Sequence, residues 1–180
     1  DTTRGPLTLS VTIVGEVPAG AAITRGGARA GDDLWISGQP GRAALGLAAL
    51  RGETGLDAIH HAEFVDALQR PQPRVALGLA LRSLASAMLD VSDGLLGDLR
   101  HLLECSGTGA IVEVAALPLA ALAASGADPA LCRRCLLAGG DDYELLFAAA
   151  PRHRAEIDAL SARLDLPLHR IGEFTPARER

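Results

Sequence analysis

The stretch from Leu89 to Leu99, LDVSDGLLGDL, constrains the fold of this chain most, because it predicts a strand that runs directly into a helix. Ser86 to Val91 is short and mostly apolar, as in a buried strand. The apolar residues that follow recur with helical spacing, namely Leu95, Leu96, Leu99, Leu102 and Leu103. Ser92 or Asp93 is therefore the expected N-cap of this helix.

Two interpretations of this junction remain open. In the first, Ser92, Asp93 and Gly94 form an ordinary helix cap with no chemical role. In the second, Asp90 marks a binding site, because a carboxylate buried at the end of a strand is costly unless it is paired or bound to a metal. Oxygen ligands from Asp90 and Asp93 suit Mg²⁺, which one or two carboxylates plus substrate phosphates commonly hold. The free N–H groups of a helix N-terminus suit a phosphate.

Composition narrows the fold class and the partners. Of the 180 residues, 48% are hydrophobic but only 3% aromatic, so Ala and Leu must fill the core, which favours helices packed on a sheet. A net charge of −5, with no basic stripe, argues against a nucleic-acid partner. Glu113 and Pro118 interrupt the longest apolar runs, so no membrane span is expected. Three cysteines without a disulfide framework favour the cytoplasm.

Two missing residue types exclude several mechanisms. The chain contains no Lys and no Asn, and all 17 of its basic residues are Arg. A P-loop lysine, a Schiff-base lysine and a Cys-His-Asn triad are thereby excluded. If these residues handle phosphate, they must do so with metal, Arg and backbone N–H groups.

The order of the predicted elements indicates the fold class. Strands are expected at Leu7–Val14, Leu34–Ser37, Ser86–Val91, Ala110–Val114, Leu145–Ala149 and Leu168–Ile171. Helices are expected at Arg42–Leu50, Asp57–Leu68, Val75–Leu84, Leu95–Glu104, Leu119–Ala124, Pro129–Leu137 and Arg154–Leu164. This alternation predicts an α/β or α+β sandwich. A chain that opens almost directly into a strand is expected to be a fragment, with a linker at Pro18–Gly20.

A second acidic stretch, Gly139–Leu145 (GGDDYEL), precedes the predicted strand Leu145–Ala149. Its two glycines permit close backbone approach, and its carboxylates fit either an acidic turn or a site. The ligand spacing of an EF-hand is absent.

Four motifs in this order resemble the successive signatures of the thiamine-monophosphate kinases. They are residues 1–5 (DTTRG), 25–32 (RGGARAGD), 90–95 (DVSDGL) and 139–145 (GGDDYEL). The resemblance covers essentially the whole chain. It implies the fold shared with aminoimidazole ribonucleotide (AIR) synthetase, selenophosphate synthetase and the hydrogenase maturation dehydratase. Residues 1–18 would then be the end of a PurM-like N-terminal ATP-binding domain, with its last strand, and residues 19–180 an AIR synthetase (PurM)-like C-terminal domain whose own C-terminal end is missing.

The resemblance also implies site residues. Asp1, Asp90 and Asp93 match Mg²⁺ ligands of the family, and Asp1, Arg25 and Ser92 match its ATP-binding residues. Asp141 falls where the family usually has a substrate-binding Glu, one methylene longer. No side chain is implied as an acid, base or nucleophile.

The implied activity is ATP-dependent phosphorylation of thiamine monophosphate to thiamine diphosphate, by in-line transfer assisted by several Mg²⁺ ions. The family further implies a cytoplasmic homodimer. Two alternatives remain: another ATP-dependent enzyme of the same fold, of the selenophosphate synthetase or hydrogenase maturation type, and an isolated module that is inactive because half of the nucleotide site is missing.

Overall fold

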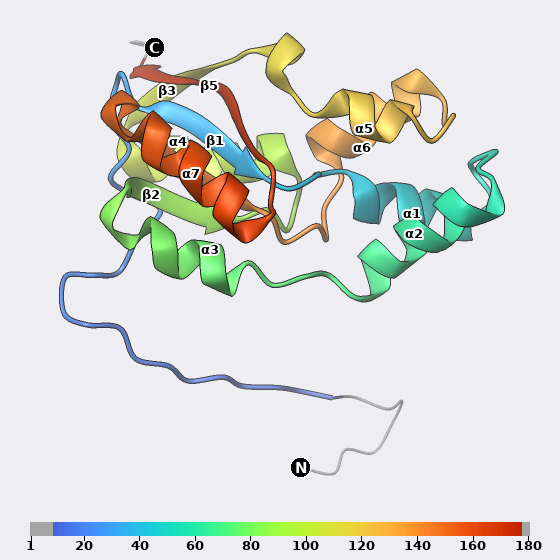
Figure 1. Cartoon of the computed structure of the whole chain (residues 1–180), viewed down its shortest axis with the longest axis horizontal. Helices are drawn as coiled ribbons and strands as arrows, with labels where there is room; N and C mark the ends of the chain where they lie inside the picture. Colours follow the sequence, from blue (N-terminus) through green and yellow to red (C-terminus); the bar gives the residue numbers. More distant parts are fainter. Residues whose placement is uncertain (1–8, 178–180) are drawn as a thin grey trace.

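A computed structural model describes residues 9–177 and contains one five-stranded sheet (Figure 1). The strands are β1 (Asp33–Ser37), β2 (Ala85–Asp90), β3 (Thr108–Val112), β4 (Leu145–Ala149) and β5 (Leu168–Pro176). Their order across the sheet is β2-β4-β1-β5-β3, and every pairing is antiparallel. Of the two predicted fold classes, the structure therefore has the α+β arrangement.

Helices cover both faces of the sheet. They are α1 (Arg42–Leu50), α2 (Ala58–Gln69), α3 (Val75–Ala80), α4 (Leu95–Ser106), α5 (Leu119–Ala123), α6 (Pro129–Ala138) and α7 (Arg154–Leu164). Short 3₁₀ turns occur at Leu81–Ser83, Val114–Ala116 and Pro151–His153. No helix within residues 9–177 has the length and apolar character needed to cross a bilayer.

Alternation along the strands builds two separate cores. Trp35 and Phe147, stacked on neighbouring strands, pack with Leu77, Ile157 and Leu160 beneath α3 and α7. On the opposite face, Leu34, Ile36, Leu146 and Leu89 pack with Leu95, Leu99 and Leu102 of α4. Successive strand side chains point to opposite faces, so β1, β2, β4 and β5 each contribute to both cores. Burying each such Leu or Phe side chain contributes roughly 1.5–3 kcal/mol.

Most predicted elements are confirmed. The predicted first strand, Leu7–Val14, is wrong over residues 9–14, the part of it that the structure describes. Residues 9–14 of Leu7–Val14 have no regular structure, and residues 7 and 8 lie outside the described range. Leu9, Val11 and Ile13 are each more than 80% exposed. In Figure 1 this segment extends away from the sheet below α3. A strand requires a hydrogen-bonded neighbour, and the described residues supply none for this segment.

Smaller differences concern element ends. The predicted helix Val75–Leu84 is α-helical only to Ala80 and continues as a 3₁₀ turn. β3 lies two residues earlier than predicted, and β5 continues to Pro176 rather than ending at Ile171. The longer β5 pairs along its second half with β3, a tertiary partner that the local pattern does not show.

Candidate functional site

The two acidic motifs, 50 residues apart in sequence, lie side by side in the fold. β2 pairs with β4 up to Asp90 and Leu145, and the pairing then continues through the loops at the end of the sheet. The Val91 N–H donates to the Glu144 carbonyl (2.8 Å), and the Tyr143 N–H donates to the Val91 carbonyl (2.9 Å). The Asp141 N–H donates to the Ser92 carbonyl (3.0 Å). Tertiary pairing thus joins residues 90–94 and 139–144 into one candidate site.

Glycine is required where these loops meet. A Cβ on Gly140 would lie 2.2 Å from the Ser92 carbonyl oxygen. Gly94 has a φ of +110°, and a Cβ there would lie 2.8 Å from the Ala138 backbone. Both contacts are with backbone atoms, which cannot move aside as a side chain would. The glycines of both motifs therefore serve the close approach of two loops.

The loop around Asp141 has an unusual backbone. Asp141 and Tyr143 both have positive φ, 66° and 53°, a region that costs energy for residues other than Gly. The Asp141 side chain is exposed at this bend. The surrounding hydrogen bonds hold the loop in a conformation that the chain would not favour by itself.

The predicted cap of α4 is wrong. Gly94 is the N-cap, and neither Ser92 nor Asp93 caps the helix with its side chain. Instead, one carboxylate oxygen of the buried Asp98, Oδ2, accepts hydrogen bonds from the Ser92 N–H (3.0 Å) and the Asp93 N–H (2.9 Å). The positive φ of Gly94 turns the chain so that these N–H groups face back toward the helix.

Asp90 is the last residue of β2 and Asp93 lies in the loop that follows, and the Asp90 side chain is exposed. The expectation that it is buried is therefore wrong, since β2 is an edge strand whose last residue leaves the covered part of the sheet. Asp93 is also exposed, and one ligand atom from each of Asp93, Asp98 and His101 lies within 4.8 Å of the others. Asp90 is not a member of that group.

Arg25 lies at the other end of α4. The Ser106 hydroxyl donates to the Arg25 carbonyl (3.2 Å), whereas Asp93 precedes the start of the helix, about 16 Å away along its axis. Within residues 9–177, the Arg25 guanidinium makes no ion pair. Asp1 lies outside the described residues. The structure thus brings Ser92, Asp93 and Asp141 together, with Asp90 beside them, and does not bring Arg25 to them.

Asp142, the neighbour of Asp141, was not among the predicted site residues and anchors the loop to α1. Its carboxylate accepts hydrogen bonds from the N–H groups of Gly41 (2.6 Å) and Ala43 (3.0 Å) at the helix N-terminus. Burial raises the pKa of Asp142 to about 6, although the two N–H groups favour its charged form.

Glu144 provides a second anchor that the sequence analysis missed. Its buried carboxylate accepts two hydrogen bonds from the Arg74 guanidinium (2.6 and 2.8 Å) and one from the Ser37 hydroxyl (2.5 Å). Gly38 leaves room for this carboxylate, because a Cβ there would overlap it. Asp142 and Glu144 both pair with residues 70 or more positions away in sequence. No local sequence pattern therefore predicts these two anchors.

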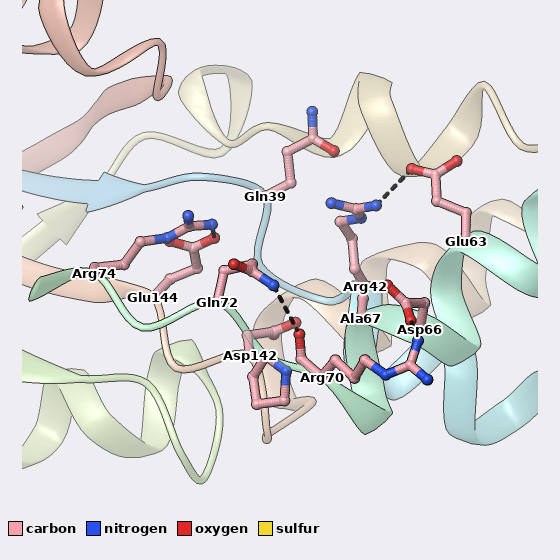
Figure 2. A pocket seen from close by; sticks show the side chains of 11 residues that line it. Gln39, Arg42, Glu63, Asp66, Ala67, Arg70, Gln72, Arg74, Asp142 and Glu144 are labelled. Atoms are coloured by element: carbon pink, nitrogen blue, oxygen red, sulfur yellow. Dashed lines mark hydrogen bonds and ion pairs between the residues drawn. The ribbon is translucent and has the colours of Figure 1, made fainter.

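A polar pocket of about 150 Å³ opens beside this loop (Figure 2). It is lined on one side by Asp142 and Glu144 and on the other by α2 and the segment that joins α2 to α3. Its three arginines are paired with carboxylates, as Arg42 with Glu63, Arg70 with Asp66 and Arg74 with Glu144. The lining therefore offers hydrogen-bonding groups with largely balanced charge.

The donor set at the junction suits a hard cation. Asp90 and Asp93 present exposed carboxylates, which are the oxygen ligands that Mg²⁺ prefers. Within residues 9–177, neither the Ser92 nor the Asp93 side chain makes a hydrogen bond, so both are free to meet a ligand.

Known proteins are similar to this chain in sequence and in fold. Residues 29–180 match the family described as AIR synthase related protein, C-terminal domain. The chain is 40% identical over 176 residues to the thiamine-monophosphate kinase of Salmonella typhimurium, covering 97% of this chain and 54% of the relative. The corresponding values for the Escherichia coli K12 thiamine-monophosphate kinase are 39%, 97% and 54%. The chain thus spans about half the length of the curated relatives it matches.

Solved structures of similar fold include proteins with the same name. The thiamine-monophosphate kinase of Stenotrophomonas maltophilia has a TM-score of 0.81 at 40% identity, over 90% of this chain and 53% of that one. AaThiL complexed with AMPPCP and TMP has a TM-score of 0.71 at 27% identity, over 87% of this chain and 48% of that one. HypE of E. coli, at 21% identity, shares the fold alone. Since the family match spans most of the sequence, the chain belongs to the AIR synthase related proteins, whose C-terminal domain it carries.

Proposed function

We propose that the full-length polypeptide that carries this chain is a thiamine-monophosphate kinase, which transfers the γ-phosphoryl group of ATP to thiamine monophosphate and releases thiamine diphosphate and ADP. The observation that carries the proposal is the junction of the two acidic motifs, where the Asp141 N–H donates to the Ser92 carbonyl (3.0 Å). The names of relatives at about 40% identity support the same activity.

The chemistry suits a site without an acid, base or nucleophile of its own. The attacking oxygen belongs to a phosphate that is already ionised, so positioning and charge neutralisation supply the catalysis. Asp90 and Asp93 would hold Mg²⁺, which would offset the repulsion between the two anionic substrates. Ser92 would contact the nucleotide and Asp141 the thiamine phosphate. The roles of Asp1 and Arg25 in ATP binding, and of Asp1 in metal binding, remain part of this proposal.

The proposal extends to the rest of the protein. Residues 1–18 would close a preceding ATP-binding domain, and the remainder would form the C-terminal domain. The exposed apolar residues of segment 9–14 support this division, since a strand of another sheet would bury them. A cytoplasmic homodimer is proposed from the family resemblance.

The first test measures ADP and thiamine diphosphate formation by the full-length protein. We expect Asp90→Asn to lower kcat/KM by about 100-fold or more, because a lost metal ligand removes charge neutralisation in the transition state. Asp158→Asn, an exposed carboxylate on α7, is the matched control and should leave the rate unchanged. Wild-type turnover and Mg²⁺ dependence in the Asp90→Asn variant would refute the metal role.

A second variant tests the substrate side. We expect Asp141→Ala to raise KM for thiamine monophosphate more than KM for MgATP, because its side chain would contact only the first substrate. Equal changes in both constants would count against that role. If the wild-type protein made no thiamine diphosphate, another ATP-dependent enzyme of this fold would become the better candidate.

A further inference from the structure

Asp98 makes an interaction that ordinary helix capping does not explain. A cap satisfies the free N–H groups in the first turn of its own helix, which here begin at Leu95. Asp98 accepts from neither the first helical residue nor the N-cap Gly94. Its Oδ2 instead accepts from the N–H groups of Ser92 and Asp93, both outside the helix. The Asp98 carboxylate therefore fixes the preceding loop rather than the helix end.

The same loop is held from its other side by the second motif. The Ser92 peptide carbonyl accepts from the Asp141 N–H (3.0 Å), and Gly140 packs directly against that oxygen. The Ser92 backbone is thus fixed at both its N–H and its carbonyl, while its hydroxyl makes no hydrogen bond within residues 9–177. Asp93 shares this arrangement of a fixed N–H and an exposed side chain. A fixed backbone that presents free side chains is a preorganised binding loop.

We propose that Asp98 is a positioning residue for the site, which orients Asp93 and Ser92 toward metal and nucleotide through its two backbone hydrogen bonds. Burial supports this role, since Asp98 is only 4% exposed and its carboxylate is costly to bury without those two donors. The inference rests on the proposed function for the metal, the nucleotide and the kinetic readout.

The test compares Asp98→Asn, Asp98→Ala and a matched control in the full-length protein. Asp98→Ala removes the acceptor and should lower kcat/KM for MgATP by about 10–100-fold, the usual effect of losing a residue that orients a metal ligand. It should also raise the Mg²⁺ concentration needed for half-maximal activity. Asp98→Asn keeps a carbonyl oxygen to accept both N–H groups and should recover most of the rate.

The control is Asp128→Ala. Asp128 is another carboxylate that accepts a backbone N–H, that of Leu131 (2.8 Å), but it caps α6 at the end remote from the site. We expect this variant to lower Tm without changing either kinetic constant. If Asp98→Ala behaved in the same way, with wild-type kinetics below its Tm, Asp98 would be merely structural and the proposal would be overturned.

Two measurements do not depend on turnover. Hydrogen exchange should speed up at residues 91–94 and 140–143 in Asp98→Ala, because the loop loses one of its two supports. Mn²⁺, used as a spectroscopic probe, should bind more weakly to Asp98→Ala than to Asp98→Asn. A wild-type protein with no kinase activity would defeat the proposed function but leave these two results to decide the positioning role. Unchanged exchange with equal loss of Mn²⁺ binding in both variants would overturn it, because Asp98 would then act as a ligand.

Discussion

Individual glycine residues determine how closely the two acidic motifs approach each other. Gly140 lies against the Ser92 carbonyl, where a Cβ would be only 2.2 Å from the oxygen. We expect Gly140→Ala to lower the free energy of unfolding by about 1–3 kcal/mol, because the backbone must move apart to admit the methyl group. The measurement is urea unfolding of the chain.

The matched control is Gly97, a glycine that lies outside both motifs. Gly97 lies within α4, and a Cβ there would meet only the Asp93 Cβ at an ordinary 3.9 Å. Gly97→Ala should therefore raise stability by about 0.5–1 kcal/mol, since Ala loses less backbone entropy in a helix. If Gly140→Ala and Gly97→Ala changed the free energy of unfolding in the same direction, the close approach of the two motifs would not explain why position 140 is glycine.

At the scale of elements, a carboxylate from one motif caps a distant helix. α1 has no side-chain cap of its own residues, and Asp142 accepts hydrogen bonds from its first N–H groups. Burial raises the pKa of Asp142 to about 6, above the ordinary value of 3.8. The native state therefore binds this proton more tightly than the unfolded chain. The stability that Asp142 contributes is full below pH 3.8 and is lost as the pH rises through about 6.

Asp142→Asn removes this titration and keeps one of the two acceptor oxygens for α1. We expect the variant to gain stability relative to wild type as the pH rises from 4 to 7, measured as the free energy of unfolding in urea. Asp142→Ala loses the cap and should lie about 1 kcal/mol below Asp142→Asn at every pH. Parallel pH profiles for wild type and Asp142→Asn would show that this carboxyl does not titrate in that range.

At the scale of the whole molecule, segment 9–14 carries strand-forming residues that nothing in residues 9–177 covers. We expect its amide protons to exchange slowly in the full-length protein and rapidly in the 180-residue chain, because a preceding domain would supply the neighbouring strand. Equal exchange in both proteins would contradict the assignment of this segment to another sheet.

We also expect the 180-residue chain to bind MgATP weakly and to lack kinase activity.

The sequence by itself determined most of the elements and the residue types of the two acidic motifs. Residues 42–50, 145–149 and 154–164 have the predicted structure to the residue, because each is an apolar or amphipathic run between turn or proline signals. Asp90 was noticed because a helix cap does not need a carboxylate at the end of the preceding strand, whereas the role of Asp141 came only from the family resemblance. These signals are local, and local physics is sufficient to produce them.

Tertiary structure alone decided which residues meet. The pairing of β2 with β4 continues through the loops and joins Ser92 to Asp141, while Asp142 and Glu144 found backbone or arginine partners that no spacing rule predicts. It also left Asp90 exposed, and it gave residues 9–14 no strand partner among residues 9–177. The physical reason is that buried polar groups and strand edges must be satisfied by whichever neighbours the folded chain supplies, and those neighbours lie far away in sequence.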